Sequence, residues 1–180
     1  MGTRRRQLRL ATTSRHSDLD KLLGRFDSQL SYHRYLLVTE AFRSSVEGEL
    51  EKAARWLGAN PQPLLVLNEV RADCYDLGLT QTLRMAAIRP ISRTDQWLGA
   101  QYVLEGSSLG ARVLFAKARQ LGLSGEFGAR HLAKQVGDPE RWSCFLTALE
   151  LAEPFDLDVA ISVAQHVFDV VIEVAEAYHG

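Results

Sequence analysis

Apolar residues recur at helical spacing along most of this chain, and the alternation expected of strands is nearly absent. Between Ser31 and Trp56, apolar side chains return every three or four residues, which is the period of a helix with one buried face. Breaks in the pattern fall at residues 58–63, Gly78, Pro90, residues 122–128 and Pro154. The pattern predicts an all-α bundle of about seven or eight helices with short connections.

Residues typical of helix ends give approximate boundaries. We expect an early helix over residues 6–23, a long one from Ser31, a third over residues 64–76, and another running from Thr94 towards residue 121. Asp138 followed by Pro139 predicts a helix start, because the acid can cap and proline suits the first turn. A last helix is predicted from Asp156 or Asp158 to near residue 178.

Length and charge limit the classes of protein that fit. The 180 residues suit one domain over residues 1–180. Lys and Arg number 21 against 22 Asp and Glu, which argues against nucleic-acid binding because phosphate contacts need a basic excess. Only residues 1–6 are locally basic, and we expect them to form a flexible, solvated tail.

The lack of a targeting signal in the sequence and the spacing of its two cysteines lead us to expect a cytoplasmic protein. No basic and apolar leader opens the chain, and no run of about 18 apolar residues predicts a membrane span. Cys74 and Cys144 lie far apart and lack metal-ligand spacing. We therefore expect both to be reduced, buried thiols.

His16 is the first candidate for chemistry. It falls on the predicted apolar stripe of the early helix, together with Leu8, Thr12 and Leu19. A neutral imidazole there could ligate iron, although its position alone favours a core histidine. The other histidines lack spacing suited to a metal, and no helix pair carries the Glu-x-x-His pattern of a di-iron site. They are His33, His131, His166 and His179.

The second candidate is a predicted helix over residues 102–114 with small residues at its centre. Gly106 and Gly110 are four residues apart and share a helix face. Each glycine costs a helix interior about 0.5–1 kcal/mol relative to alanine, so something must offset the loss. A flat ligand lying against bare backbone and tight helix–helix packing explain the glycines equally well.

Together these two segments resemble the bacterial, biliverdin-producing haem oxygenase family. Residues 10–16 are similar to its proximal helix, in which a threonine, here Thr12, precedes the iron-ligating histidine by one turn. Residues 102–114, with Glu-Gly-Ser ahead of Leu-Gly, resemble its distal helix. The spacing between the segments and the total length also fit. The resemblance implies a single haem oxygenase domain, with haem between the first helix and a kinked distal helix.

The resemblance also implies roles for individual residues. His16 would ligate the iron, and Arg9 would pair with a haem propionate unless it is a solvated surface arginine. Ser107 stands where other members carry a distal acid, and its hydroxyl could still organise water. Ala111, in place of a glycine, could tilt the haem. The implied catalytic residues are Gly106, Ser107 and Gly110, and the implied haem-binding residues are Arg9, Thr12, His16, Tyr102, Gly106, Gly110 and Phe168.

Two further residues receive weaker expectations. Glu105 is expected to face outward or to pair with a cation. Arg141 lies in the region where the family carries cationic residues, but the match there is poor.

The implied activity uses haem as both substrate and cofactor and yields biliverdin, carbon monoxide and ferrous iron. Electrons would come from a ferredoxin or a flavoprotein reductase, for which Arg112, Lys117 and Arg119 form either a docking surface or an ordinary solvated face. A bilin-binding photoreceptor would be a natural acceptor of the product.

Two other classes stay open. A haem carrier or sensor without turnover would explain the missing distal acid and Ala111. The other is a haem-free relative, such as a thiaminase-like enzyme or an interaction module. Such enzymes need a thiol nucleophile or an acidic cluster in the pocket, and neither cysteine has an evident base partner.

Overall fold

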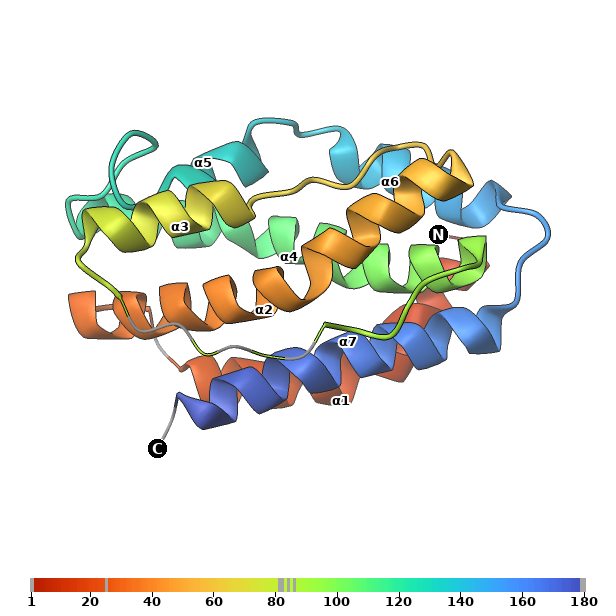
Figure 1. Cartoon of the computed structure of the whole chain (residues 1–180), viewed down its shortest axis with the longest axis horizontal. Coiled ribbons are helices and arrows are strands. Elements are labelled where there is room, and N and C mark those ends of the chain that lie inside the picture. The colour runs from red at the N-terminus through yellow and green to blue at the C-terminus, as the bar shows by residue number, and fades with distance from the viewer. Residues whose placement is uncertain (1, 25, 81–82, 84, 86, 179–180) are drawn as a thin grey trace.

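The computed structural model describes residues 2–24, 26–80, 83, 85 and 87–178, and these form seven α-helices (Figure 1). In chain order the helices are α1 (Thr3–Leu23), α2 (Gln29–Leu57), α3 (Leu67–Asp76), α4 (Thr94–Gln120), α5 (Arg130–Val136), α6 (Arg141–Leu151) and α7 (Leu157–Ala177). The described residues contain no strand beyond one isolated bridge between Ser124 and Gly128. The predicted all-α class and the predicted number of helices are confirmed.

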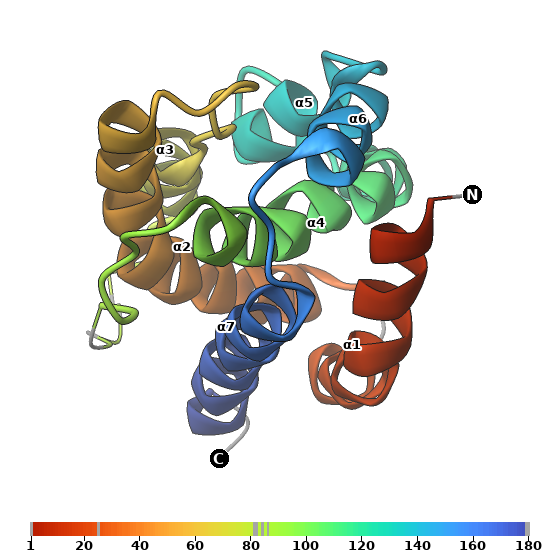
Figure 2. The same ribbon diagram turned by 90° about the vertical axis from the view of Figure 1, so that its right-hand side faces the viewer.

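The main core forms around α7, which packs against α1, α2 and α4. Asp156 caps α7, because its carboxylate accepts from the backbone amides of Asp158 and Val159. One face of α7 then enters the core through small and β-branched side chains, including Ala160, which lies against Gly99 of α4. Seen from the end of the bundle, α4 lies over α7 with α1 to one side of both (Figure 2).

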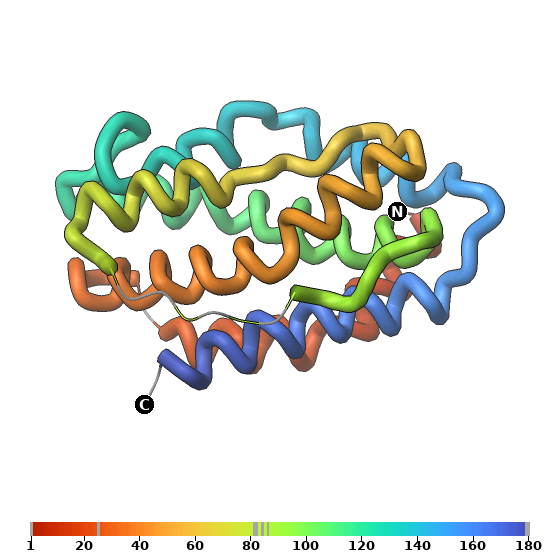
Figure 3. The backbone as a smooth tube through the Cα atoms, viewed as in Figure 1, coloured from red at the N-terminus to blue at the C-terminus, as the bar shows by residue number. Residues whose placement is uncertain are grey.

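A second, smaller core joins the remaining helices. Tyr32 and Leu36 of α2 are fully buried there with Val70 of α3, Ala111 of α4 and Leu132 of α5. The connection between α3 and α4 returns along the bundle, and its described residues 87–91 lie beside α2 and α7 (Figure 3). These two cores hold α4 from several sides, and α4 is the helix that carries the glycines.

Several predicted boundaries move by a few residues. Ser28, rather than Ser31, caps α2, and the two serines exchange side-chain and backbone hydrogen bonds as a capping box. α3 begins at Leu67, three residues later than predicted. α6 begins at Arg141, and Asp138 instead accepts from the backbone amide of Glu140 in the preceding turn.

The predicted flexible tail is wrong for residues 3–6, which form the first turns of α1. The Arg4 guanidinium donates to the backbone carbonyls of Leu149 and Ala152 at 2.8 Å each and pairs with Glu153 at 2.6 Å. It also lies 4.2 Å from the centre of the Phe155 ring. The basic residues at this end therefore dock α1 onto the end of α6.

The two cysteines differ. Cys74 is buried, as predicted, and burial raises the pKa of its thiol to about 12. Cys144 is exposed, so the prediction that it is buried is wrong. None of the helices in the described part of the chain is long and apolar enough to cross a membrane.

Candidate functional site

His16 stands out from α1 rather than lying in the core. Its side chain is 66% exposed, and its Nδ1 lies 3.0 Å from the Asp20 carboxylate one turn later. Its ring centre is 6.1 Å from that of Phe168 on α7. A carboxylate that accepts from Nδ1–H fixes the tautomer and leaves the lone pair of Nε2 for a metal. The interpretation of His16 as a core histidine is therefore wrong.

The turn of α1 that carries His16 is fixed on α7 from both sides. Arg15 pairs with Asp169 through a 2.6 Å contact between Nε and Oδ1, and this hydrogen bond raises the pKa of the arginine. The side chain of Gln165 donates to the backbone carbonyl of Ala11 at 2.9 Å. These contacts hold Phe168 and His16 in register.

α4 meets α1 at Tyr102. Its phenol interacts with the side chain of Thr12, which is buried and donates its hydroxyl hydrogen to the carbonyl of Leu8 at 2.8 Å. Burial raises the pKa of Tyr102, although Arg5, the Thr12 hydrogen bond and Arg9 act in the opposite direction. Two predicted haem-binding residues, Thr12 and Tyr102, are thus brought together.

Beyond this contact α4 presents bare backbone. α1 and α4 run in the same general direction along the bundle (Figure 1), so His16 and Gly106 each lie one turn past the Thr12–Tyr102 contact. A Cβ built at Gly106 or Gly110 would meet no heavy atom within 4 Å. The structure therefore excludes tight helix packing as the reason for these two glycines and favours the approach of a ligand.

Apolar side chains flank the two glycines. Leu109 and Val113 are 56% and 60% exposed on the same part of α4. Large exposed apolar side chains beside bare backbone are typical of a surface that a flat apolar ligand would cover.

Next to the two glycines, the side chain of Ser107 is hydrogen-bonded within the protein. The Ser107 hydroxyl donates to the Leu104 carbonyl at 2.6 Å and accepts from Arg43 at 3.1 Å and from Gln135 at 3.3 Å. A hydroxyl has one hydrogen and two lone pairs, so all its bonds are used. The expectation that Ser107 organises water stays a prediction, and these three contacts are the ones a water molecule would have to replace.

Ala111 and Glu105 are buried and so face away from the bare side of α4. The methyl group of Ala111 is fully buried in the second core, so it cannot tilt a ligand lying over Gly110. Glu105 is 1% exposed rather than outward-facing, and it pairs with Arg141, whose Nε lies 2.9 Å from both carboxylate oxygens. Gln101 donates to the same carboxylate.

A further buried polar cluster lies between α3 and α5 and was not predicted. The Nδ1 of His131 lies 2.7 Å from Asp73, and its Nε2 lies 3.2 Å from the hydroxyl of Tyr35. Burial lowers the pKa of His131 more than Asp73 raises it, so the ring is neutral. Asp73 also pairs with Arg130. Both ring nitrogens are engaged, which makes His131 a structural histidine.

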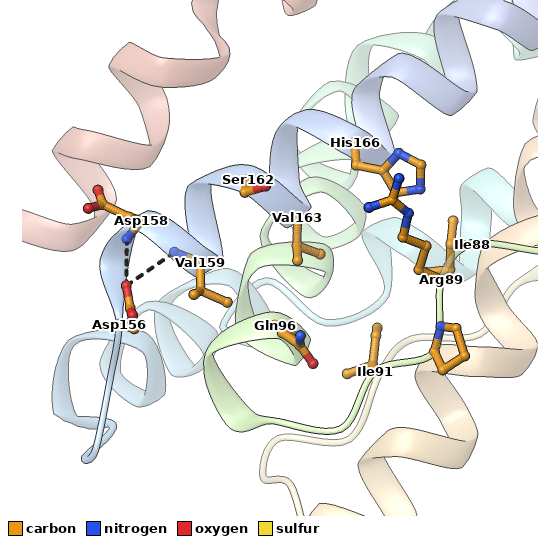
Figure 4. Close-up of a pocket in the computed structure, with 11 residues that line it drawn as sticks. Ile88, Arg89, Ile91, Gln96, Asp156, Asp158, Val159, Ser162, Val163 and His166 are labelled. Carbon is orange, nitrogen blue, oxygen red and sulfur yellow. Dashed lines mark hydrogen bonds between the residues drawn. The ribbon is translucent and has the colours of Figure 1, made fainter.

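The predicted haem-binding residues do not line two cavities elsewhere in the structure. A cavity of about 450 Å³ lies between residues 88–91 and the first half of α7, where Arg89 and His166 come close together (Figure 4). Another of about 510 Å³ lies beside Arg71 and Cys74. Among the residues that the structure describes, no three His, Cys, Asp or Glu side chains gather as a metal site.

A known relative identifies the family of this chain. No family model matches the chain. The chain is 31% identical over 156 residues to the haem oxygenase PigA of Pseudomonas aeruginosa, a match that covers 82% of this chain and 77% of PigA. The chain belongs to the haem oxygenase family. The predicted family is confirmed.

The solved structures support the same fold. The structure of the NO- and CO-bound haem oxygenase of Neisseria meningitidis matches with a TM-score of 0.80 and 27% sequence identity, over 100% of this chain and 93% of that one. Haem is the substrate and cofactor of haem oxygenases. The residues here suit it, because α1 offers an exposed imidazole whose Nδ1 contacts Asp20 and α4 offers open helical backbone at Gly106 and Gly110.

Proposed function

We propose that this chain binds haem between α1 and α4 and opens the macrocycle to biliverdin, carbon monoxide and ferrous iron. Two observations carry the proposal: His16 on α1 is exposed with its Nδ1 next to Asp20, and the backbone of α4 is open at Gly106 and Gly110. Membership of the family supports it. So does the relative from Neisseria meningitidis, whose structure holds the diatomic ligands NO and CO.

The roles on the α1 side follow from the contacts of His16. Nε2 of His16 would ligate the iron, while Asp20 holds Nδ1–H and so fixes the plane and the tautomer of the ring. Arg9, exposed two turns earlier on α1, would pair with a propionate. The ring of Phe168 would give the site an apolar edge next to His16. Thr12, which is buried one turn before His16, would limit how far the haem can enter between the helices.

The roles on the α4 side follow from what its backbone leaves open. Bound haem supplies the iron that activates oxygen and the porphyrin that is cleaved. Gly106 and Gly110 admit the macrocycle close to the helix, because no side chain stands in between. Leu109 and Val113 would exclude water from the same face, which favours oxidation of the ring over loss of reactive species to solvent.

Electrons for the reaction come from outside the chain in this proposal. A ferredoxin or a flavoprotein reductase would supply them, and the exposed cations Arg112, Lys117 and Arg119 of α4 offer a place for an acidic donor to dock. Delivery of the product to a bilin-binding photoreceptor is a compatible use of biliverdin.

Replacing His16 by Ala tests the ligand. The variant should lose the absorption spectrum of histidine-ligated haem, while His166→Ala, which removes a half-buried histidine lining another cavity, should keep it. Equal spectra for the wild-type protein and His16→Ala would refute the assignment.

Turnover separates an enzyme from a carrier or sensor. The purified haem complex, given ascorbate in air, should lose its Soret band and form biliverdin, identified by its absorption. A stable ferrous-oxy complex would instead identify a haem carrier or sensor, and failure to bind haem would favour a haem-free relative.

A further inference from the structure

Arg43 of α2 is a buried cation beside the centre of α4. Its side chain is 4% exposed, its Nη1 donates to Glu47 at 3.2 Å, and its Nη2 donates to the Ser107 hydroxyl at 3.1 Å. A buried guanidinium is costly unless it is paired and hydrogen-bonded. The contact with Ser107 crosses from α2 to the turn of α4 that carries Gly106.

The Ser107 hydroxyl has no capacity left for a ligand or a water molecule. It donates its hydrogen to the Leu104 carbonyl, and its two lone pairs accept from Arg43 and Gln135. The polarity of this turn is therefore set by the two donors to Ser107, which are Gln135 and the positively charged Arg43.

The groups facing Arg43 leave its charge directed towards α4. On α2, Glu47 is its ion-pair partner, but that carboxylate also accepts from the backbone amides of Val66 and Leu67 at 2.8 and 3.0 Å, so it is drawn towards the start of α3. Tyr35 stays neutral, because burial raises the pKa of its phenol to about 12.

Two more groups face Arg43 from other helices. Glu105 of α4 lies within its electrostatic reach, but Arg141 pairs with that carboxylate. His131 of α5 is neutral, because burial lowers the pKa of its imidazole. The positive end of the Arg43–Glu47 pair therefore lies at Ser107.

We propose that Arg43 tunes the haem site through its charge: the hydrogen bond to Ser107 holds the guanidinium against the Gly106 turn of α4, and the buried positive charge would act from there on ligands of a bound haem. This inference rests on the proposed function. A fixed positive charge there favours anionic over neutral ligands at the iron, without a distal carboxylate.

The test is the pH midpoint of the acid–alkaline spectral transition of the ferric haem complex. Losing a buried unit charge near a titrating group moves its midpoint by roughly one pH unit, which corresponds to about 1.4 kcal/mol. Arg43→Met should raise the midpoint by about that amount. Arg43→Lys, which keeps the charge, should move it much less, and so should Ser107→Ala, whose hydroxyl has no free bond.

A second variant is needed in case Arg43→Met does not fold, because that change leaves the buried carboxylate of Glu47 without its cation. Arg43→Met combined with Glu47→Gln removes both charges, and its midpoint should still rise, because the cation is the member of the pair that contacts Ser107. A midpoint equal to that of the wild-type protein in this variant, or a larger shift in Ser107→Ala than in Arg43→Met, would overturn the inference alone. Failure of the wild-type chain to bind haem would overturn the proposed function as well.

Discussion

Exchanging three glycines of α4 for alanine, one at a time, separates packing from ligand approach. Gly99, Gly106 and Gly110 lie on one continuous helix, and none has the positive φ that only glycine adopts easily. They differ in what a Cβ would meet. At Gly99 it would lie closer than 3.0 Å to the carbonyl group of Ala160, whereas at Gly106 and Gly110 it would meet nothing within 4 Å.

The magnitudes follow from these surroundings. Alanine is favoured over glycine in a helix interior by about 0.5–1 kcal/mol, so Gly106→Ala and Gly110→Ala should each stabilise the haem-free protein by that amount. For a chain of this size, 1 kcal/mol corresponds to roughly 2–4 °C in Tm. Gly99→Ala should instead lose about 1–3 kcal/mol, because backbone cannot move aside as a flexible side chain can.

Haem affinity should change in the opposite sense to stability. A methyl group on the bare face stands between helix and macrocycle, so Gly106→Ala and Gly110→Ala should weaken haem binding about tenfold or more, which corresponds to about 1.4 kcal/mol. Urea unfolding of the haem-free protein and haem titration followed at the Soret band measure the two effects. Destabilisation of Gly106→Ala as large as that of Gly99→Ala would refute the open face, and unchanged haem affinity would refute the site.

Two further predictions concern the buried polar groups. Burial lowers the pKa of the His131 imidazole, so below about pH 6.5 the unfolded state binds a proton that the native state does not bind. The free energy of unfolding should therefore fall as the pH drops below that value. Urea midpoints at pH 8 and 5.5 should show this fall in the wild-type protein and a smaller one in His131→Asn; equal falls would contradict it. Arg141→Met should cost about 3–5 kcal/mol by leaving the carboxylate of Glu105 buried without a cation, and Glu105→Met in the same chain should restore most of it. Thermal denaturation of the single and double variants measures the difference, and a single variant as stable as the double one would contradict the pairing.

Features that depend on local sequence were predicted well. Thr94 begins α4 and Asp156 caps α7, because side chains a few residues away decide such ends. The shared face of Gly106 and Gly110 also follows from helical geometry alone. Periodicity missed α5, since its seven residues span only about two turns.

Features that depend on distant partners were not predicted. The partners of Arg4 lie 145 to 149 residues away, so the basic start of the chain looked like a solvated tail. Arg43 and Glu47 are spaced as an ordinary surface pair on a helix, and only their burial distinguishes them. His131 gave no signal either, because its partner Asp73 lies on another helix.

The polar contacts behind α4 explain how its bare side can exist. Gly106 and Gly110 weaken the helix and contribute no packing on the face that they share. Contacts from three other helices offset this loss of helix stability. Arg141 of α6 pairs with Glu105, Arg43 of α2 donates to Ser107, and α7 packs closely against Gly99. Charge-assisted hydrogen bonds are directional, so they fix the rotation of α4 about its axis as well as its position. Apolar contacts alone would permit some rotation, and the direction of the glycine face would then not be fixed. The ion pairs are therefore as much a part of the candidate site as the imidazole that they never touch.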